Sequence, residues 1–273
     1  MQATMKLQAS RLIRDSYVYF KMPYALLAHF DRIAAAYDQL DRRQKLAFSF
    51  PEQTDGFLPF GLEYSETPER PDLCERFCYW SARRDVHREF SLARTPFYRE
   101  MAAYETCINA IAQDLLDAIC ENLGGTPQQP VKESSYLQFC SYERHHCRHD
   151  RAYLQDPHED GHLLSFIRPT GPGLILLPDS APVSALPRSD EMIVLAGSLL
   201  EALTDGEVPA MPHAVEHPRT PIRRQSLMYF VNPDLSAGHA STIVHRRPVD
   251  LRALAERRHV AFGNRALPGP CAA

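Results

Sequence analysis

The sequence predicts a mainly β protein with flanking helices, and three observations support this fold class. From residue 136 onward, short apolar runs alternate with turn-forming Gly, Pro, Asp and Ser, which is typical of a β-sandwich or barrel. Residues 95–123 carry an apolar stripe at helical spacing. Apolar residues make up 44% of the 273-residue chain, which is enough for a full hydrophobic core.

The first part of the chain is predicted to be helical with one strand. A β-prone run covers residues 16–20, and Leu26, Phe30 and Ile33 then recur on one helical face. The longest predicted helix ends at a Gly-Gly pair that follows residue 123. Its stripe consists of Met101, Tyr104, Ile108, Ile111, Leu115 and Ile119. Such a stripe is typical of core packing.

The second part of the chain is predicted to supply the strands. The predicted strands cover residues 136–142, 163–167, 173–177, 192–195 and 226–231. A helix is predicted near 249–258. We therefore divide one structural unit into an N-terminal α-rich layer (1–130), a β core (131–235) and a C-terminal segment (236–273).

Bulk composition excludes several classes of protein. Thirty basic and 34 acidic residues give a net charge of −4, which does not indicate a nucleic-acid or membrane partner. No apolar run reaches membrane-spanning length, and the first residues lack a signal-peptide core. The seven cysteines are odd in number and scattered, so they do not indicate a disulfide framework. These features predict a cytoplasmic protein.

The strongest candidate site begins at His158 and Asp160. Side chains two apart on an extended strand point to the same face, so an imidazole and a carboxylate would converge there. Together with a second histidine they would form the facial set that is typical of non-haem Fe(II) oxygenases. Taken alone, the pair fits an exposed loop after Pro157 better than it fits a metal site.

Two later elements extend this pattern. His213 supplies a second histidine, and Arg224 and Ser226 follow at the start of an apolar run. Arg224 and Ser226 would share one strand face. A guanidinium pairs bidentately with a carboxylate, and a serine hydroxyl can add one donor. The combination suits a small diacid that chelates iron at one end and is held at the other.

The order of these motifs resembles the isopenicillin N synthase-like group of Fe(II)/2-oxoglutarate oxygenases, which carry H-x-D, a distal His and R-x-S. Residues 56–64 (Gly-Phe-Leu-Pro-Phe-Gly-Leu-Glu-Tyr) and 71–75 (Pro-Asp-Leu-Cys-Glu) are similar to the N-terminal G-Y-x-P-x-G-x-E and P-D-x-K-E signatures of that group. Residues 231–234 are similar to its sequence after R-x-S. The resemblance covers most of residues 10–235.

The resemblance implies a double-stranded β-helix, a relative of the jelly roll. It implies Fe(II) bound by His158, Asp160 and His213. The co-substrate 2-oxoglutarate would be held by Arg224 and Ser226 with help from Tyr142. O2 would then oxidise a small organic substrate by hydroxylation, desaturation or cyclisation, within specialised metabolism. By family position, the substrate pocket would be lined by Phe139, His162, Met228 and Phe230, and the C-terminal segment would act as a lid.

The chain departs from the family pattern at three positions near the site. Cys140 stands where the family has an asparagine two residues before the tyrosine. Ala214 replaces the usual arginine after the distal histidine, and Ser198 replaces an acidic residue. None of the three is a predicted metal ligand, so they bear on the surroundings of the metal.

Other functions remain open at this stage. One is a same-fold Fe(II) oxidase that uses no 2-oxoglutarate, with Arg224 and Ser226 binding a substrate carboxylate. Another is a non-catalytic binding protein on a decayed fold. Residues 213–217 also match H-x-x-E-H, a zinc-protease motif that requires a helix, although the flanking Pro212 and Pro218 disfavour one. The His-rich run 145–150 is a further candidate metal site or a solvated loop.

Overall fold

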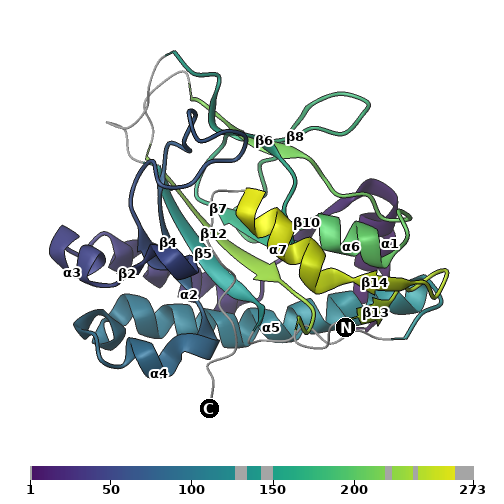
Figure 1. Ribbon diagram of the computed structural model, residues 1–273, viewed down its shortest axis with the longest axis horizontal. Helices are drawn as coiled ribbons and strands as arrows, with labels where there is room; N and C mark the ends of the chain where they lie inside the picture. Colours follow the sequence, from purple (N-terminus) through teal and green to yellow (C-terminus); the bar gives the residue numbers. More distant parts are fainter. Residues whose placement is uncertain (1, 127–133, 143–149, 219–222, 236–238, 262–273) are drawn as a thin grey trace.

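The chain folds around two antiparallel sheets (Figure 1). This computed structural model describes residues 2–126, 134–142, 150–218, 223–235 and 239–261. The major sheet has eight strands in the order β1-β10-β7-β12-β5-β4-β3-β2. These strands are β1 (Tyr17–Lys21), β2 (Ser49–Phe50), β3 (Asp55–Leu58), β4 (Glu75–Tyr79), β5 (Tyr136–Tyr142), β7 (Leu164–Pro169), β10 (Glu191–Ala196) and β12 (Arg224–Val231).

The minor sheet faces the centre of the major one. Its four strands have the order β6-β11-β8-β9. They are β6 (Tyr153–His158), β8 (Leu174–Leu176), β9 (Val183–Ser184) and β11 (His213–Glu216). A separate hairpin joins β13 (His239–Ser241) to β14 (Pro248–Asp250). Apolar side chains from both sheets, such as Leu176, Ile167 and Met228, form one core between them.

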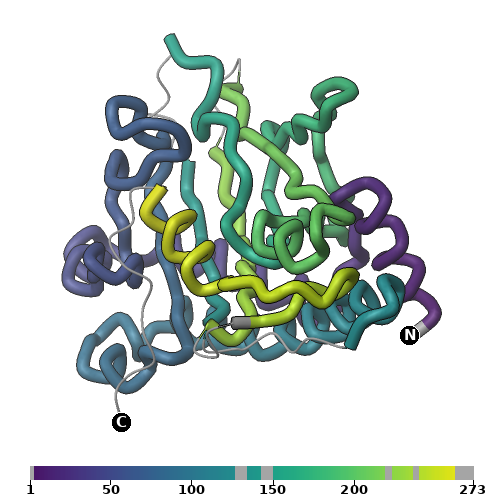
Figure 2. The backbone as a smooth tube through the Cα atoms, turned by 45° about the vertical axis from the view of Figure 1, so that its right-hand side comes forward, coloured from purple at the N-terminus to yellow at the C-terminus, as the bar shows by residue number. Residues whose placement is uncertain are grey.

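Helices flank the two sheets. They are α1 (Gln2–Asp15), α2 (Tyr24–Tyr37), α3 (Arg42–Ala47), α4 (Arg84–His87), α5 (Pro96–Asn122), α6 (Ser198–Leu203) and α7 (Leu251–Ala261), with short 3-10 turns at Pro51–Gln53, Ser81–Arg83 and Ser91–Arg94. Helices α1, α2 and α5 cover the other face of the major sheet, whereas the end of α7 lies beside His158. The long helix α5 lies along the sheet, and α1 and α2 pack against it (Figures 1 and 2). The larger core lies between these helices and the sheet.

Helix α5 forms where the sequence pattern predicts it. The hydroxyl of Thr95 accepts a hydrogen bond from the backbone N–H of Tyr98, and Pro96 occupies the first turn, where its missing N–H has no cost. Gly124 ends the helix with a φ of 71°, a conformation that favours glycine. The apolar stripe, including Met101, Ile108 and Leu115, is buried except for Ile111, which is partly buried.

Most sequence predictions of secondary structure agree with these elements. The predicted strands correspond to β1, β5, β7, β8, β10 and β12, and the predicted C-terminal helix corresponds to α7. The helical requirement of the zinc-protease motif is not met, because His213–Glu216 is strand β11. Residues 145–149 of the His-rich run lie outside the described part of the chain.

The N-terminal layer contributes more than helices. Four strands before residue 130, β1 to β4, belong to the same sheet as β5, β7, β10 and β12. The two parts of the chain therefore share the major sheet and both hydrophobic cores. Among the described residues, no helix has both the length and the apolar character needed to cross a membrane.

Candidate metal and co-substrate site

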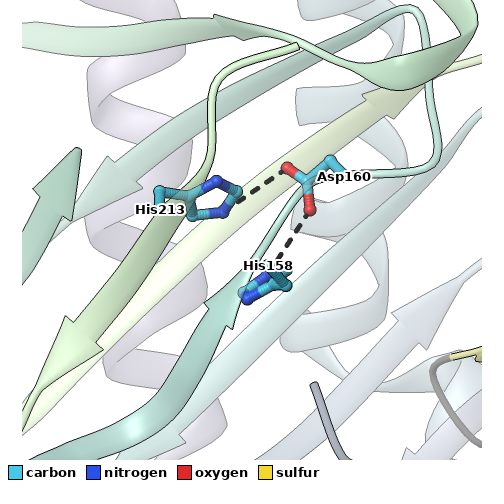
Figure 3. A group of neighbouring side chains, drawn as sticks. All are labelled: His158, Asp160 and His213. Atoms are coloured by element: carbon cyan, nitrogen blue, oxygen red, sulfur yellow. Dashed lines mark ion pairs between the residues drawn. The ribbon is translucent and has the colours of Figure 1, made fainter. Parts of the chain in front are cut away.

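Strand pairing brings the three predicted metal ligands together. His158 ends β6, and His213 begins β11 directly opposite it in the register. Asp160 follows in the turn after β6, so its carboxylate points back between the two rings (Figure 3). Its Oδ1 lies 3.7 Å from Nε2 of His158, and its Oδ2 lies 3.7 Å from Nε2 of His213. All three ligand atoms lie within 4.8 Å of one another, which is close enough to bind one ion.

Backbone carbonyls orient the two imidazoles. Nδ1 of His158 lies 2.8 Å from the carbonyl oxygen of Asp156, and Nδ1 of His213 lies 3.1 Å from that of Met211. Because a carbonyl only accepts, each Nδ1 must carry the proton, which leaves the lone pair of each Nε2 directed at Asp160. Such outer hydrogen bonds are the usual way in which metal-binding histidines are held.

The charge state of the cluster also suits a metal ion. Burial lowers the pKa of His213, although the nearby Asp160 opposes this effect. Burial acts to raise the pKa of Asp160, but His213, His158 and His162 outweigh it and hold that pKa below its usual value. One oxygen of Asp160, Oδ2, is buried and has no hydrogen-bond partner among the described residues. Two imidazoles whose Nδ1 atoms are held by carbonyls, and one carboxylate with an oxygen that lacks a hydrogen bond, fit a divalent cation such as Fe(II).

Arg224 and Tyr142 form a second cluster in the same cavity. They are directly paired across β12 and β5, and the guanidinium carbon lies 4.8 Å from the centre of the Tyr142 ring. Nε of Arg224 donates to the carbonyl of Pro172 at 3.1 Å, and the Tyr142 hydroxyl donates to Gln155. Nη1 of Arg224 is buried with no partner in the described chain. A fixed guanidinium with an unused donor fits a ligand carboxylate.

Ser226 lies two residues along β12 and also lines this cavity, as do all three predicted metal ligands. The adjacent Arg223 is not part of it: its guanidinium pairs with Asp38 and is half exposed. The structure therefore places Arg224, and not Arg223, opposite the histidines.

Of the four residues predicted to line the substrate pocket, three lie on the wall of this cavity and one does not. His162, Met228 and Phe230 line the cavity. Phe139 does not, because it lies on the opposite face of β5. There it packs on Tyr37 and Phe97 with ring centroids 4.6 Å and 6.1 Å away. The position of Phe139 could have been predicted from strand alternation, because a residue three positions before Tyr142 faces the other side of the sheet.

The N-terminal motifs contribute cavity residues that the sequence did not assign. Glu63 and Asp72 come from the two N-terminal signatures, and Arg76 follows on β4. Nη1 of Arg76 lies 2.7 Å from Oε2 of Glu63, and its Nη2 pairs with Asp72. Tyr136 and Gln138 also line the cavity. The signal for these two was again alternation, since they share the strand face of Tyr142.

The three departures from the family pattern lie around the cluster. The Sγ of Cys140 is buried and accepts from the amide of Gln138 at 3.5 Å. Ser198 begins α6, and its backbone N–H donates to the carbonyl of Asp160 at 2.9 Å. Ala214 is fully buried beside His213. Of these, Ser198 acts directly on the turn that carries a predicted ligand.

No family model matches the sequence, and no curated protein matches it. Solved structures do match. Rice dioxygenase for auxin oxidation is 17% identical with a TM-score of 0.74, over 97% of this chain and 92% of that one. A full-length Neurospora crassa protein in complex with alpha-KG and thymine is 16% identical with a TM-score of 0.71, over 96% and 92%. JOX2 in complex with 2OG, Fe and JA is 15% identical with a TM-score of 0.64, over 97% and 83%.

These similarities define the fold. The chain has the fold of the 2OG-Fe(II) oxygenases, and the predicted double-stranded β-helix core with flanking helices is confirmed.

Proposed function

We propose that the protein is an Fe(II)- and 2-oxoglutarate-dependent dioxygenase that oxidises a small organic substrate. One observation carries this proposal. His158, Asp160 and His213 converge at one side of a cavity, and the other side presents Arg224 with a buried, unpaired nitrogen among the described residues. A facial metal site opposite a carboxylate-binding arginine suits a co-substrate that is a chelator at one end and a carboxylate at the other.

The metal ligands and the co-substrate residues would have separate roles. His158, Asp160 and His213 would hold the metal on one side and leave its other positions open. Arg224 and Ser226 would bind the far carboxylate of 2-oxoglutarate, with the Tyr142 ring as one wall. When bound, Fe(II) and 2-oxoglutarate supply, with O2, the oxidising power, and the protein positions the substrate and excludes water.

The substrate is inferred to be a small molecule. The similar Neurospora crassa and JOX2 structures hold thymine and JA. A net charge of −4 gives no electrostatic reason for nucleic acid to bind. We infer a cytoplasmic enzyme of specialised metabolism whose product is hydroxylated, desaturated or cyclised.

Anaerobic titration with Fe(II) and 2-oxoglutarate, followed by O2, tests the proposal. We expect both to bind together and O2 to produce succinate, faster when a substrate is present. Absence of Fe(II) binding would point to a non-catalytic protein. Oxidation of substrate without consumption of 2-oxoglutarate would point to the oxidase alternative, in which Arg224 binds a substrate carboxylate.

A further inference from the structure

The cavity has two ends, and the strand register separates them. Arg224 pairs with Tyr142 at one end of β12 and β5, whereas Phe230 pairs with Tyr136 at the other. The strand between the two pairs spans about 20 Å at the usual rise per residue. The Arg224 end is the proposed co-substrate site, so the Tyr136 end is available to the substrate.

At the substrate end, the hydroxyl of Tyr136 has a fixed direction. The amide nitrogen of Asn232 donates to the carbonyl of Ser134 at 2.6 Å, so its Oδ1 must accept from Nδ1 of His162, 3.0 Å away. Nε2 of His162 is then an acceptor, and the Tyr136 hydroxyl, 3.4 Å away, donates to it. The Tyr136 oxygen therefore offers only lone pairs to the cavity.

The acidic residues of the cavity wall are acceptors as well. The hydroxyl of Ser65 donates to both oxygens of Asp72, at 3.0 Å and 2.9 Å. Arg76 uses Nη1 for Glu63 and Nη2 for Asp72, and its Nε is buried without a partner in the described chain. Most donors here are already used, while carboxylate and phenol lone pairs remain.

The formal charges of the groups around the cavity also disfavour an anionic substrate. At the metal and co-substrate sites, the formal charges sum to zero over Fe(II), the 2-oxoglutarate dianion, Asp160 and Arg224. Glu63, Asp72 and Arg76 leave one negative charge on the cavity wall between the two ends, because Arg76 lies opposite Cys140 on β5 and Gln155 links Asp72 to Tyr142. Burial raises the pKa of Glu63, so this part of the wall already disfavours negative charge. A substrate carboxylate placed there would be buried beside a like charge, and this is costly in a medium of low dielectric constant.

Aromatic rings define the shape of this end. The Tyr136 ring stacks on Trp80 with centroids 4.1 Å apart and an interplanar angle of 16°, and Phe230 lies 5.0 Å from it on β12. His162 lies 4.4 Å from Phe230. Rings held in this way suit a flat ligand.

We propose that the substrate is a flat, uncharged or cationic molecule whose N–H or O–H donors bind Glu63 and Tyr136, and that the cavity rejects carboxylate substrates. This inference rests on the proposed function, because the charge balance includes Fe(II) and 2-oxoglutarate. Glu63 and Tyr136 are then the residues that determine specificity.

Three probes of nearly equal shape test it: benzamidine is a cation with N–H donors, benzamide is uncharged with N–H donors, and benzoate is an anion without donors. Their affinities for the anaerobic Fe(II)/2-oxoglutarate complex are measured by calorimetry, so that turnover is not needed. We expect benzamidine and benzamide to bind about 10-fold or more tightly than benzoate, as a hydrogen bond to a charged group predicts. Benzoate binding as tightly as the other two overturns the proposal.

Two variants assign the preference to residues. Glu63→Gln should reduce the benzamidine-to-benzoate ratio by about 10-fold, whereas Glu66→Gln, at an exposed glutamate outside the cavity, should leave it unchanged. Tyr136→Phe removes the phenol acceptor and should weaken benzamide several-fold with no change for benzoate. An unchanged ratio in both cavity variants overturns the assignment, and 2-oxoglutarate affinity verifies that each variant is folded.

The two proposals fail differently. If Fe(II) and 2-oxoglutarate do not bind, the proposed function fails and this inference fails with it. If both bind and benzoate is nevertheless preferred, only the substrate class is wrong.

Discussion

The two faces of β5 and β12 differ sharply although they belong to the same strands. On the face toward the helices lie Leu137, Phe139, Leu227 and Tyr229, all buried in the larger core. A polar atom that this face buries, the Tyr229 hydroxyl, donates to Asn109 on α5 at 2.8 Å. On the face toward the cavity lie Tyr136, Gln138, Tyr142, Arg224, Ser226 and Met228.

The two faces differ in the charge of the groups that lack hydrogen-bond partners. On the helix-facing side of β5, the neutral hydroxyl of Ser141 is buried without one in the described chain. Around the cavity, the buried atoms without one in that part of the chain include atoms of two charged groups, Nη1 of Arg224 and Oδ2 of Asp160. A buried polar group without a partner costs about 1–3 kcal/mol. The helix-facing side therefore stabilises the fold, whereas the cavity side retains unfavourable groups that a metal ion and a carboxylate would satisfy.

Loss of a metal ligand should have the largest effect. Asp160→Ala should reduce 2-oxoglutarate-dependent succinate formation by far more than the roughly 100-fold typical of groups that only support a ligand. Glu159→Ala is the matched control: Glu159 lies between two ligands in sequence but is partly exposed and pairs with Arg258. Equal loss in both variants would contradict the ligand assignment.

On the other face, Phe139→Ala should lower the free energy of unfolding by about 3–5 kcal/mol, because it leaves a cavity in a fully packed core. Denaturant unfolding measures this value. The affinity of the folded variant for 2-oxoglutarate should not change.

Met228→Ala tests the stability contribution of the cavity-facing side of β12. Met228 lines the cavity, so part of its surface has no packing to lose, and its truncation should destabilise the protein less than that of Phe139. A larger loss for Met228 would mean that the two faces do not differ in the way described.

Arg224→Ala should weaken 2-oxoglutarate by roughly 30-fold or more, since a buried charge pair loses one partner. The free energy of unfolding without ligands should also fall, by about 1.5–3 kcal/mol, because the buried guanidinium loses its hydrogen bond from Nε to Pro172. Arg223→Ala is the control and should leave 2-oxoglutarate affinity unchanged, because Arg223 pairs with Asp38 outside the cavity. Isothermal titration of 2-oxoglutarate measures both.

The smallest effect is expected at the C-terminal helix. Arg258 of α7 lies 3.2 Å from Glu159, and both are partly exposed, so Arg258→Ala should change the unfolding free energy by less than about 1 kcal/mol. If α7 acts as a lid over the nearby surface of His158, the substrate KM should rise modestly while 2-oxoglutarate affinity stays the same. An unchanged KM would argue against the lid.

Local patterns in the sequence were sufficient for the class of fold and for the order of the motifs. The stripe of α5, the short β-prone runs, H-x-D, the distal histidine and R-x-S each depend on neighbours in sequence. They predicted the β core, and they selected the three residues that the structure brings within 4.8 Å of one another. Their role as metal ligands stays a prediction.

Tertiary structure decided everything that depends on how distant segments pair. Only the register of β6 and β11 places His158 opposite His213, and only the pairing of β4 with β5 brings Arg76 from the N-terminal layer to the cavity wall. The same pairing left Phe139 facing the helices and made residues 213–216 a strand. Strand register depends on which face each segment can bury against the rest of the chain, and no short stretch of sequence contains that information.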